Sequence, residues 1–290
     1  GSDSASVPAD ESFTWEDGSI DSEIYYKQPA KITVTLANNT DTELMRMVAP
    51  ILFTLSGNTP TLKALADGEL FDLESGQSET REMVFTFDKF YNNMQVNTRV
   101  YVGLLDLQTS QILGQFNDQI TFTSAPAAGT LSASSFTIEG GALVKDPYAI
   151  WFDTSVSLSS GYLAAPLYVV VTDDPYNGGS VLATAASETL FMNGGKSYSA
   201  RVCLDMSGAA PGNYYALLCQ LNSSSMFSPI TNSVISFTIS PESGVEEIGA
   251  DSEASLPVEY FTLQGIRVLH PEKGGIYIRR QGSSVTKIRF

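Results

Sequence analysis

The sequence predicts an all-β protein made of two tandem β-sandwiches followed by a small C-terminal β module. Three observations support this prediction: short strand-like segments, an internal repeat, and a change in the sign of the charge near residue 258. The chain has 290 residues, which is enough for two sandwiches of about 100 residues each and one smaller unit. A hydrophobic fraction of 43% gives each unit material for a core.

The strand prediction begins with residues 31–39, where Ile32, Val34 and Leu36 alternate with polar neighbours. Alternation with a period of two is typical of a strand that buries one face. Similar segments follow along the chain, separated by Gly, Asn, Pro and Ser, which favour turns. No long segment has helical periodicity, so we expect short strands and no long helix.

Four of these segments recur in the same order further along the chain, which indicates a duplicated unit. Residues 49–57 match 165–173, 80–88 match 197–205, 99–107 match 213–221, and 117–125 match 232–240. The offsets fall between 114 and 117 residues. About seven strands in each copy suit a sandwich.

These patterns divide the chain into five predicted parts. Residues 1–24 form an acidic leader, 25–125 and 126–240 form the sandwiches, 241–257 form an acidic linker, and 258–290 form the C-terminal module. The linker holds five acids, two glycines and two prolines with few large apolar side chains. Such a composition cannot bury enough surface to fold alone.

Residues 207–221, SGAAPGNYYALLCQL, place a Pro-Gly turn before tyrosine and an alternating strand. This pattern resembles the entry to the sixth strand of immunoglobulin-like and fibronectin type III-like sandwiches. The resemblance implies that fold class for both repeats. It also implies a core position for Trp151, like the buried tryptophan of immunoglobulin sandwiches. A fold of this class does not indicate a function.

The formal charge of −16 is unevenly distributed. Residues 1–257 hold 10 Lys/Arg and 30 Asp/Glu, a net charge of −20, whereas residues 258–290 hold 6 Lys/Arg and 2 Asp/Glu, a net charge of +4. The acidic body would repel phosphate backbones, so we expect no nucleic-acid partner. No run of 18 apolar residues occurs, so we expect no membrane-spanning helix.

The tail reads VEYFTLQGIRVLHPEKGGIYIRRQGSSVTKIRF and predicts three strands joined by turns. It resembles the C-terminal sorting modules of Bacteroidetes proteins exported by type IX secretion. The shared pattern is an aromatic strand, LxG, GxYI and a basic last strand. It is carried by Tyr260, Leu263, Gly265, Val268, Gly275, Tyr277, Ile278, Val285 and Lys287. The alternative is a small third β domain packed on the second sandwich.

The resemblance implies a secreted or outer-membrane, cell-surface protein whose C-terminal module contacts the secretion machinery. Gly1-Ser2 looks like a cloning remnant, so we expect that a signal peptide once preceded the mature chain. The expected function is therefore a non-enzymatic interaction, adhesion or spacer protein whose partner is an unknown protein or glycan. Two alternatives are the accessory C-terminal region of a larger secreted protease or glycosidase, and a carbohydrate-binding module.

The residue types offer no catalytic constellation, so we predict neither enzymatic activity nor a cofactor. The single histidine, His270, can supply neither a two-histidine metal site nor a base near a cysteine in another module. Asp173, Asp174 and Asn177 form a candidate calcium loop, because calcium prefers oxygen ligands. A plain turn between strands is the alternative for this loop.

Two further pairs of residues are candidates for chemistry or binding. Cys203 and Cys219 lie on predicted strands of one domain and could form a disulfide in an oxidising compartment, or be two buried thiols. Tyr91 and Tyr176 lie in predicted loops and are candidate ligand-binding residues. The alternative is that they are scattered surface aromatics, which most proteins carry.

Overall fold

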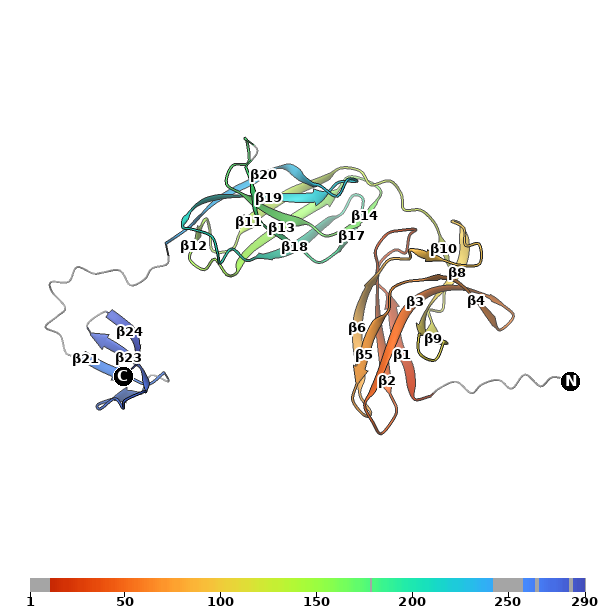
Figure 1. Cartoon of the computed structure of the whole chain (residues 1–290). Helices are drawn as coiled ribbons and strands as arrows, with labels where there is room; N and C mark the ends of the chain where they lie inside the picture. The colour runs from red at the N-terminus through yellow and green to blue at the C-terminus, as the bar shows by residue number, and fades with distance from the viewer. Residues whose placement is uncertain (1–10, 178, 242–257, 264–265, 282–283, 290) are drawn as a thin grey trace. The chain divides into compact units, whose positions relative to one another are not determined.

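A computed structural model describes residues 11–177, 179–241, 258–263, 266–281 and 284–289 (Figure 1). The all-β prediction is confirmed, since every regular element of this described part is a strand. The contacts divide the chain into two compact units. One unit holds both sandwiches and extends to Ile239, and the other holds the C-terminal module. Within the described ranges no helix is both long and apolar enough to cross a membrane.

In the first sandwich, a three-stranded sheet of order β1-β2-β6 faces a larger sheet of order β10-β8-β3-β4-β7. In the larger sheet, β5 also pairs with β3 and β9 pairs with β8. The strands are β1 (Phe13–Ile20), β2 (Ala30–Asn38), β3 (Leu44–Ser56), β4 (Thr59–Leu65), β5 (Glu69–Leu73), β6 (Ser78–Phe85), β7 (Lys89–Phe90), β8 (Thr98–Asp106), β9 (Gln111–Gln115) and β10 (Ile120–Phe122).

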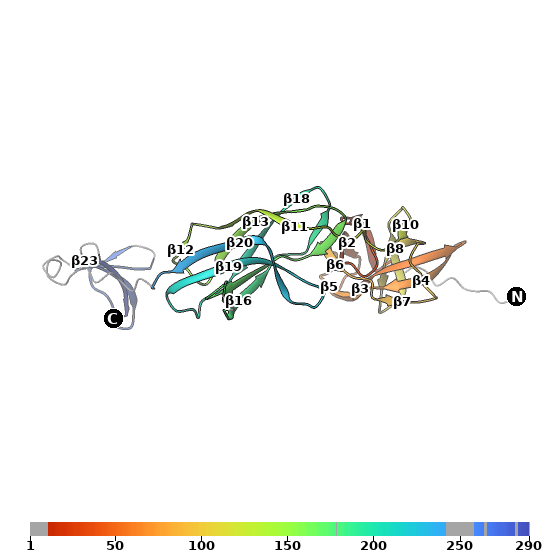
Figure 2. The same cartoon turned by 90° about the horizontal axis from the view of Figure 1, so that it is seen from above.

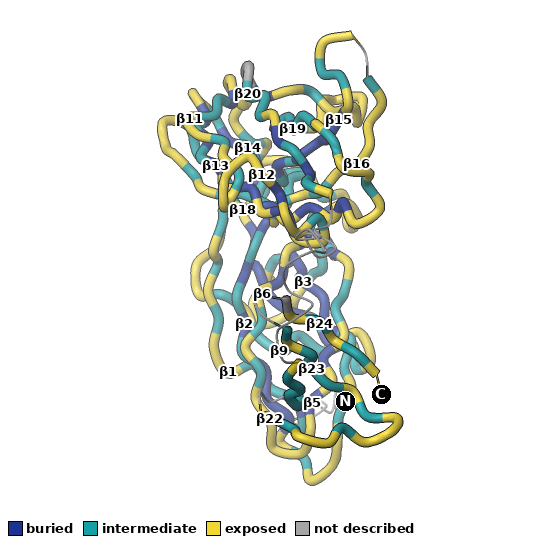
Figure 3. The backbone as a smooth tube through the Cα atoms, turned by 90° about the vertical axis from the view of Figure 1, so that its left-hand side faces the viewer, coloured by how far each residue is buried: buried dark blue, intermediate teal, exposed yellow. Residues whose placement is uncertain are grey.

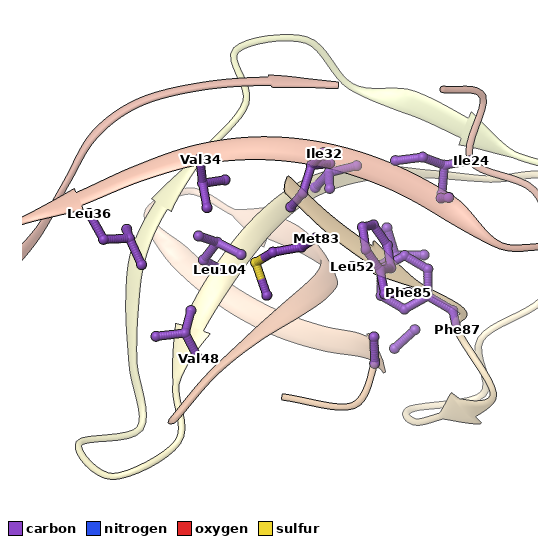
Figure 4. Packing of buried hydrophobic residues seen from close by; sticks show 14 of the residues in the cluster. Ile24, Ile32, Val34, Leu36, Val48, Leu52, Met83, Phe85, Phe87 and Leu104 are labelled. Carbon is purple, nitrogen blue, oxygen red and sulfur yellow. The ribbon is translucent and has the colours of Figure 1, made fainter. Parts of the chain in front are cut away.

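The core of this sandwich follows the alternation read from the sequence. Ile32, Val34 and Leu36 of β2 are fully buried and meet side chains of β3 and β8, such as Val48 and Leu104 (Figure 4). Each buried aliphatic side chain of this size contributes about 1.5–3 kcal/mol relative to exposure. The hydrophobic effect therefore holds the two sheets together along the whole of β2.

The predicted acidic leader is shorter than expected, because residues 13–20 form β1. This strand pairs antiparallel with β2 from Phe13 opposite Asn38 to Ile20 opposite Ile32. Phe13 is buried in the core, while the acids of β1 occupy exposed positions. The strand was missed because its acidic residues suggested a solvated segment, although the side chains that face the core are apolar.

The second sandwich has a three-stranded sheet of order β11-β13-β18, a five-stranded sheet of order β12-β20-β19-β15-β16, and the pair β14-β17. Figure 2 shows β20 and β19 side by side, with β16 toward the margin. The strands are β11 (Leu131–Ile138), β12 (Leu143–Val144), β13 (Ile150–Leu158), β14 (Tyr162–Ala165), β15 (Tyr168–Thr172), β16 (Val181–Ala186), β17 (Leu190–Asn193), β18 (Ser197–Leu204), β19 (Gly212–Leu221) and β20 (Phe227–Ile239).

The repeated segments occupy corresponding strands of the two sandwiches. β3 pairs antiparallel with β8, and β15 pairs antiparallel with β19. The alignment from sequence is nevertheless out of register at this strand. An offset of 116 matches core Leu52 with half-buried Tyr168, whereas Val169 is the inward residue. A shift of one residue moves a strand side chain to the opposite face, so the structural offset must be odd.

The C-terminal module is a four-stranded antiparallel sheet of order β22-β21-β23-β24. Its strands are β21 (Val258–Phe261), β22 (Arg267–Val268), β23 (Ile276–Gln281) and β24 (Ser284–Arg289). The three expected strands are present, and the two-residue β22 adds a fourth at one edge. None of the described side chains in this module is fully buried, and Figure 3 shows no buried stretch in β23 or β24.

Candidate interaction surfaces

The strand register assigns the side chains of the C-terminal module to two faces. Tyr260 lies opposite both Val268 and Arg279, whereas Phe261 lies opposite Ile278. Directly opposite residues share one face of a sheet, and adjacent residues on a strand point to opposite faces. We call the first side the aromatic face; it holds Tyr260, Val268, Tyr277, Arg279, Thr286 and Ile288.

The aromatic face explains the GxY spacing of the tail. The Tyr277 ring folds back over Gly275, where a Cβ atom would lie 2.5 Å from the ring. The Tyr277 hydroxyl accepts a hydrogen bond of 3.0 Å from the Glu272 backbone nitrogen. A side chain at position 275 would therefore displace the Tyr277 ring from this place.

We call the opposite side the cationic face. It holds Glu259, Phe261, Arg267, Ile276, Ile278, Arg280, Val285, Lys287 and Arg289. Its one acid, Glu259, forms an ion pair of 2.9 Å with Arg267. Ile276 is 46% exposed and Val285 is 56% exposed between the cations. This face therefore combines positive charge with accessible apolar surface.

The residues of the sorting motif divide between the two faces. Tyr260, Val268 and Tyr277 lie on the aromatic face, and Ile278 and Lys287 lie on the cationic face.

Leu263 is exposed in the turn between β21 and β22, where the Thr262 backbone nitrogen donates to the Ile266 carbonyl at 2.7 Å. Gly265, in the same turn, lies outside the described residues. His270 is exposed in the loop after β22.

The two candidate tyrosines are exposed on different sandwiches. Tyr91 directly follows β7, and its backbone nitrogen donates to the Lys63 carbonyl at 2.9 Å. Tyr176 lies in the loop between β15 and β16 and is 78% exposed, against 40% for Tyr91. Exposure makes both rings accessible, but they belong to separate surfaces and do not form one aromatic platform.

The candidate calcium loop is organised by its own hydrogen bonds. Asp174 accepts hydrogen bonds from the Asn177 side chain at 2.8 Å and from the backbone nitrogens of Tyr176 and Asn177. These bonds, that from the Asn177 side chain first, hold the pKa of Asp174 below its ordinary value. Asp173 accepts from the Ser180 backbone nitrogen at 3.1 Å. Across the described residues no group of three His, Cys, Asp or Glu side chains is placed to hold a metal ion. These hydrogen bonds give the described part of the loop the geometry of a turn, and the calcium site stays a prediction.

The disulfide that the sequence allowed is absent, because Cys203 and Cys219 are both free thiols. Cys203 is exposed on β18 of the three-stranded sheet, and Cys219 is buried on β19 of the five-stranded sheet. Val202 and Leu204 point into the core, so Cys203 between them points outward, away from the sheet that carries Cys219. Burial raises the pKa of the Cys219 thiol to about 11.

The expectation of a core role for Trp151 is wrong. Ile150 and Phe152 are buried, so the alternation of β13 points Trp151 outward, where it is 37% exposed. The Arg201 guanidinium lies over the indole at 4.5 Å from the ring centroid, and it also pairs with Asp153 at 3.2 Å. Such cation–π contacts contribute about 0.5–1 kcal/mol at exposed sites.

Sequence reasoning missed the edge formed by β16. This strand is the last of the five-stranded sheet, and Val181 and Leu182 are 57% and 46% exposed. Ala183 and Ala185 pack inward on the core. Residues 175–187 contain no charged side chain, a pattern that could have identified this edge in the sequence.

No family model and no curated protein matches this sequence. Among solved structures, 164 chains match. One is a transglutaminase of red sea bream, with 10% identity, a TM-score of 0.23, and coverage of 79% of this chain and 31% of that chain. Another is the calcium binding domain CBD12 of CALX1.1, with 8% identity, a TM-score of 0.22, and coverage of 71% and 79%. This chain thus spans about a third of the transglutaminase. Neither likeness is close enough to support a functional argument.

Proposed function

We propose that this chain is a non-enzymatic interaction protein, an adhesin or spacer of a Bacteroidetes cell surface, whose C-terminal module directs export through type IX secretion machinery. The observation that carries the proposal is the cationic face of that module. It belongs to a compact unit separate from the sandwiches, and its sign of charge is opposite to that of the acidic body.

The geometry gives the module a surface suited to recognition. Lys287 and Arg289 are exposed on the cationic face, next to the exposed apolar side chains of Ile276 and Val285. Charged groups steer association and select partners, while burial of apolar area stabilises the bound state. A receptor with an acidic rim and an apolar centre would complement this face.

The test is export of a reporter carrying residues 258–290 in a Bacteroidetes host with type IX secretion. We expect the tail to bring the reporter to the cell surface, measured as the fraction accessible to external protease. Lys287→Glu should lower that fraction by about tenfold, equivalent to ~1.4 kcal/mol. Lys273→Glu makes the same change of charge in the exposed loop before β23 and should leave export unchanged. Equal surface display of a reporter without the tail would refute the proposal.

A glycan-binding function is a second candidate, favoured by the exposure of Tyr176 at a loop of the second sandwich. Aromatic rings that stack on sugars must be accessible, and this one is. Binding to a glycan array that is lost in Tyr176→Ala and kept in Tyr91→Ala would support it. The accessory-region alternative predicts a catalytic domain encoded in the same reading frame.

A further inference from the structure

The outer edge of β16 carries less protection than natural sheet edges usually have. Among the described residues, β16 pairs with β15 and with no second strand. Natural edges are shielded by lysine, proline, a bulge or a covering segment, because open backbone groups can pair with another chain. β16 contains neither lysine nor proline, and its one such feature is a bulge at the exposed Leu182, where the pairing with β15 shifts by one residue.

In the first sandwich, the edge that corresponds to the outer edge of β16 is paired with a further strand. There β4 corresponds to β16, since Leu52 lies opposite Ala64 and Val169 lies opposite Ala185. The outer edge of β4 is covered by β7, an antiparallel strand that places Phe90 opposite Ala64. β4 also carries Pro60 and Lys63.

In the second sandwich, the segment after β18 forms a turn instead of a covering strand. The Ala209 backbone nitrogen there donates to the Met206 carbonyl at 2.9 Å. The chain therefore places a hydrogen-bonded strand along one of the two corresponding edges, whereas β16 pairs only with β15 among the described residues and has β18 of the other sheet near it.

Charge indicates which strand can cover the open edge. At a net charge of −16, two copies of the chain repel each other over most of their surfaces. Residues 175–187 form an uncharged window along the edge, bounded by Asp174 and Glu188. Two copies can approach there without placing like charges opposite each other.

The sequence of β16 is also complementary to itself in the antiparallel direction. Its larger side chains, Val181 and Leu182, come first, and small side chains follow. In both copies the inward alanines must lie on the same face of the joined sheet. Only registers that pair an odd-numbered residue with an odd-numbered one, and an even-numbered residue with an even-numbered one, satisfy this.

With Thr184 opposite its own counterpart, Ala183 meets Ala185, and Leu182, which lies at the bulge of β16, comes beside Ala186. Large side chains then lie beside small ones, and Glu188 lies opposite Ser180.

We propose that β16 pairs antiparallel with β16 of a second copy about a two-fold axis at Thr184, joining the two five-stranded sheets into one. This interface is isologous and closes after two copies. It is independent of the proposed role of the C-terminal module, because neither its residues nor its test involve residues 258–290.

Cross-linking tests the register directly. Thr184→Cys in a Cys203→Ser background places two thiols opposite each other at about 4.5–5.5 Å between Cα atoms, within the range of a disulfide. Ala186→Cys in the same background is the matched control, because its two copies would lie about 14 Å apart. We expect the first variant to form a disulfide-linked dimer at least about tenfold faster than the second under mild oxidation.

Association without cross-linking is measured by sedimentation as a function of concentration. Leu182→Lys should shift the chain to monomer, whereas Met226→Lys, at an exposed site outside β16, should not. Both positions are exposed, so circular dichroism should show unchanged folding. A monomer at all concentrations, or equal cross-linking of both cysteine variants, would overturn the proposal. Dimers insensitive to Leu182→Lys would also overturn it, by placing the contact elsewhere.

Discussion

Replacing Asp106 with asparagine removes a buried charge at the end of β8 in the first sandwich. Asp106 is 1% exposed and lies 3.1 Å from the Arg46 Nε atom. Its Oδ1 atom also accepts hydrogen bonds from the backbone nitrogens of Gln108 at 2.8 Å and Thr109 at 3.2 Å. Asparagine fits the same space and keeps the two backbone bonds, but it turns an amide NH₂ group toward the guanidinium.

The expected loss in the free energy of unfolding is about 3 kcal/mol, the lower end of the cost of breaking a buried ion pair. The lower end applies because the Arg46 side chain is 18% exposed and keeps some contact with water. Combining Asp106→Asn with Arg46→Met should recover most of the loss, to within about 1 kcal/mol, because no uncompensated charge is then left.

Urea unfolding followed by tryptophan fluorescence measures these changes. Trp15 reports on the first sandwich, where its ring packs edge-on against Phe116 at 4.9 Å between centroids. A Trp151→Phe background removes the signal of the second sandwich. A loss below about 1 kcal/mol for Asp106→Asn, or a double variant less stable than either single variant, would refute the reasoning.

The remaining predictions concern the two thiols and the carboxylate of Asp174. At a pH of about 8, a thiol reagent should label Cys203 but not Cys219 in the folded protein, and both in denaturant; labelling of both in the native state would contradict the burial of Cys219. Because the folded pKa of Cys219 is raised, its contribution to stability is complete below the ordinary value of 9.0 and is lost as the pH rises toward about 11. The pKa of Asp174 is lowered, so its contribution is complete above 3.8 and declines as the pH falls through the lower folded value. Asn177→Ala should raise the pKa of Asp174 toward 3.8 in an NMR titration, and an unchanged pKa would count against that hydrogen bond.

Strands in which apolar and polar residues alternate could be predicted from the sequence. Ile32, Val34 and Leu36 alternate without interruption, and all three are buried as that pattern requires. The turn at Asp174 could also be predicted from the sequence, since aspartate and asparagine favour such turns by hydrogen bonding to nearby backbone.

The predictions failed where the result depends on which face of a strand a residue occupies, or on which sheet its strand joins. Trp151 was assigned to the core by analogy, although its buried neighbours Ile150 and Phe152 fix the opposite face. Cys203 and Cys219 are near in sequence but belong to facing sheets, which no local pattern reveals. The open edge of β16 depends on the absence of a covering strand, a property of the topology and not of the segment itself.

The fold of Tyr277 over Gly275 gives both residues a structural role in the C-terminal module. In a sheet without a fully buried described side chain, this contact between a ring and the backbone is part of the packing. If the module directs export as proposed, a receptor would contact the cationic face, because Gly275 and Tyr277 are engaged with each other on the opposite side of the sheet.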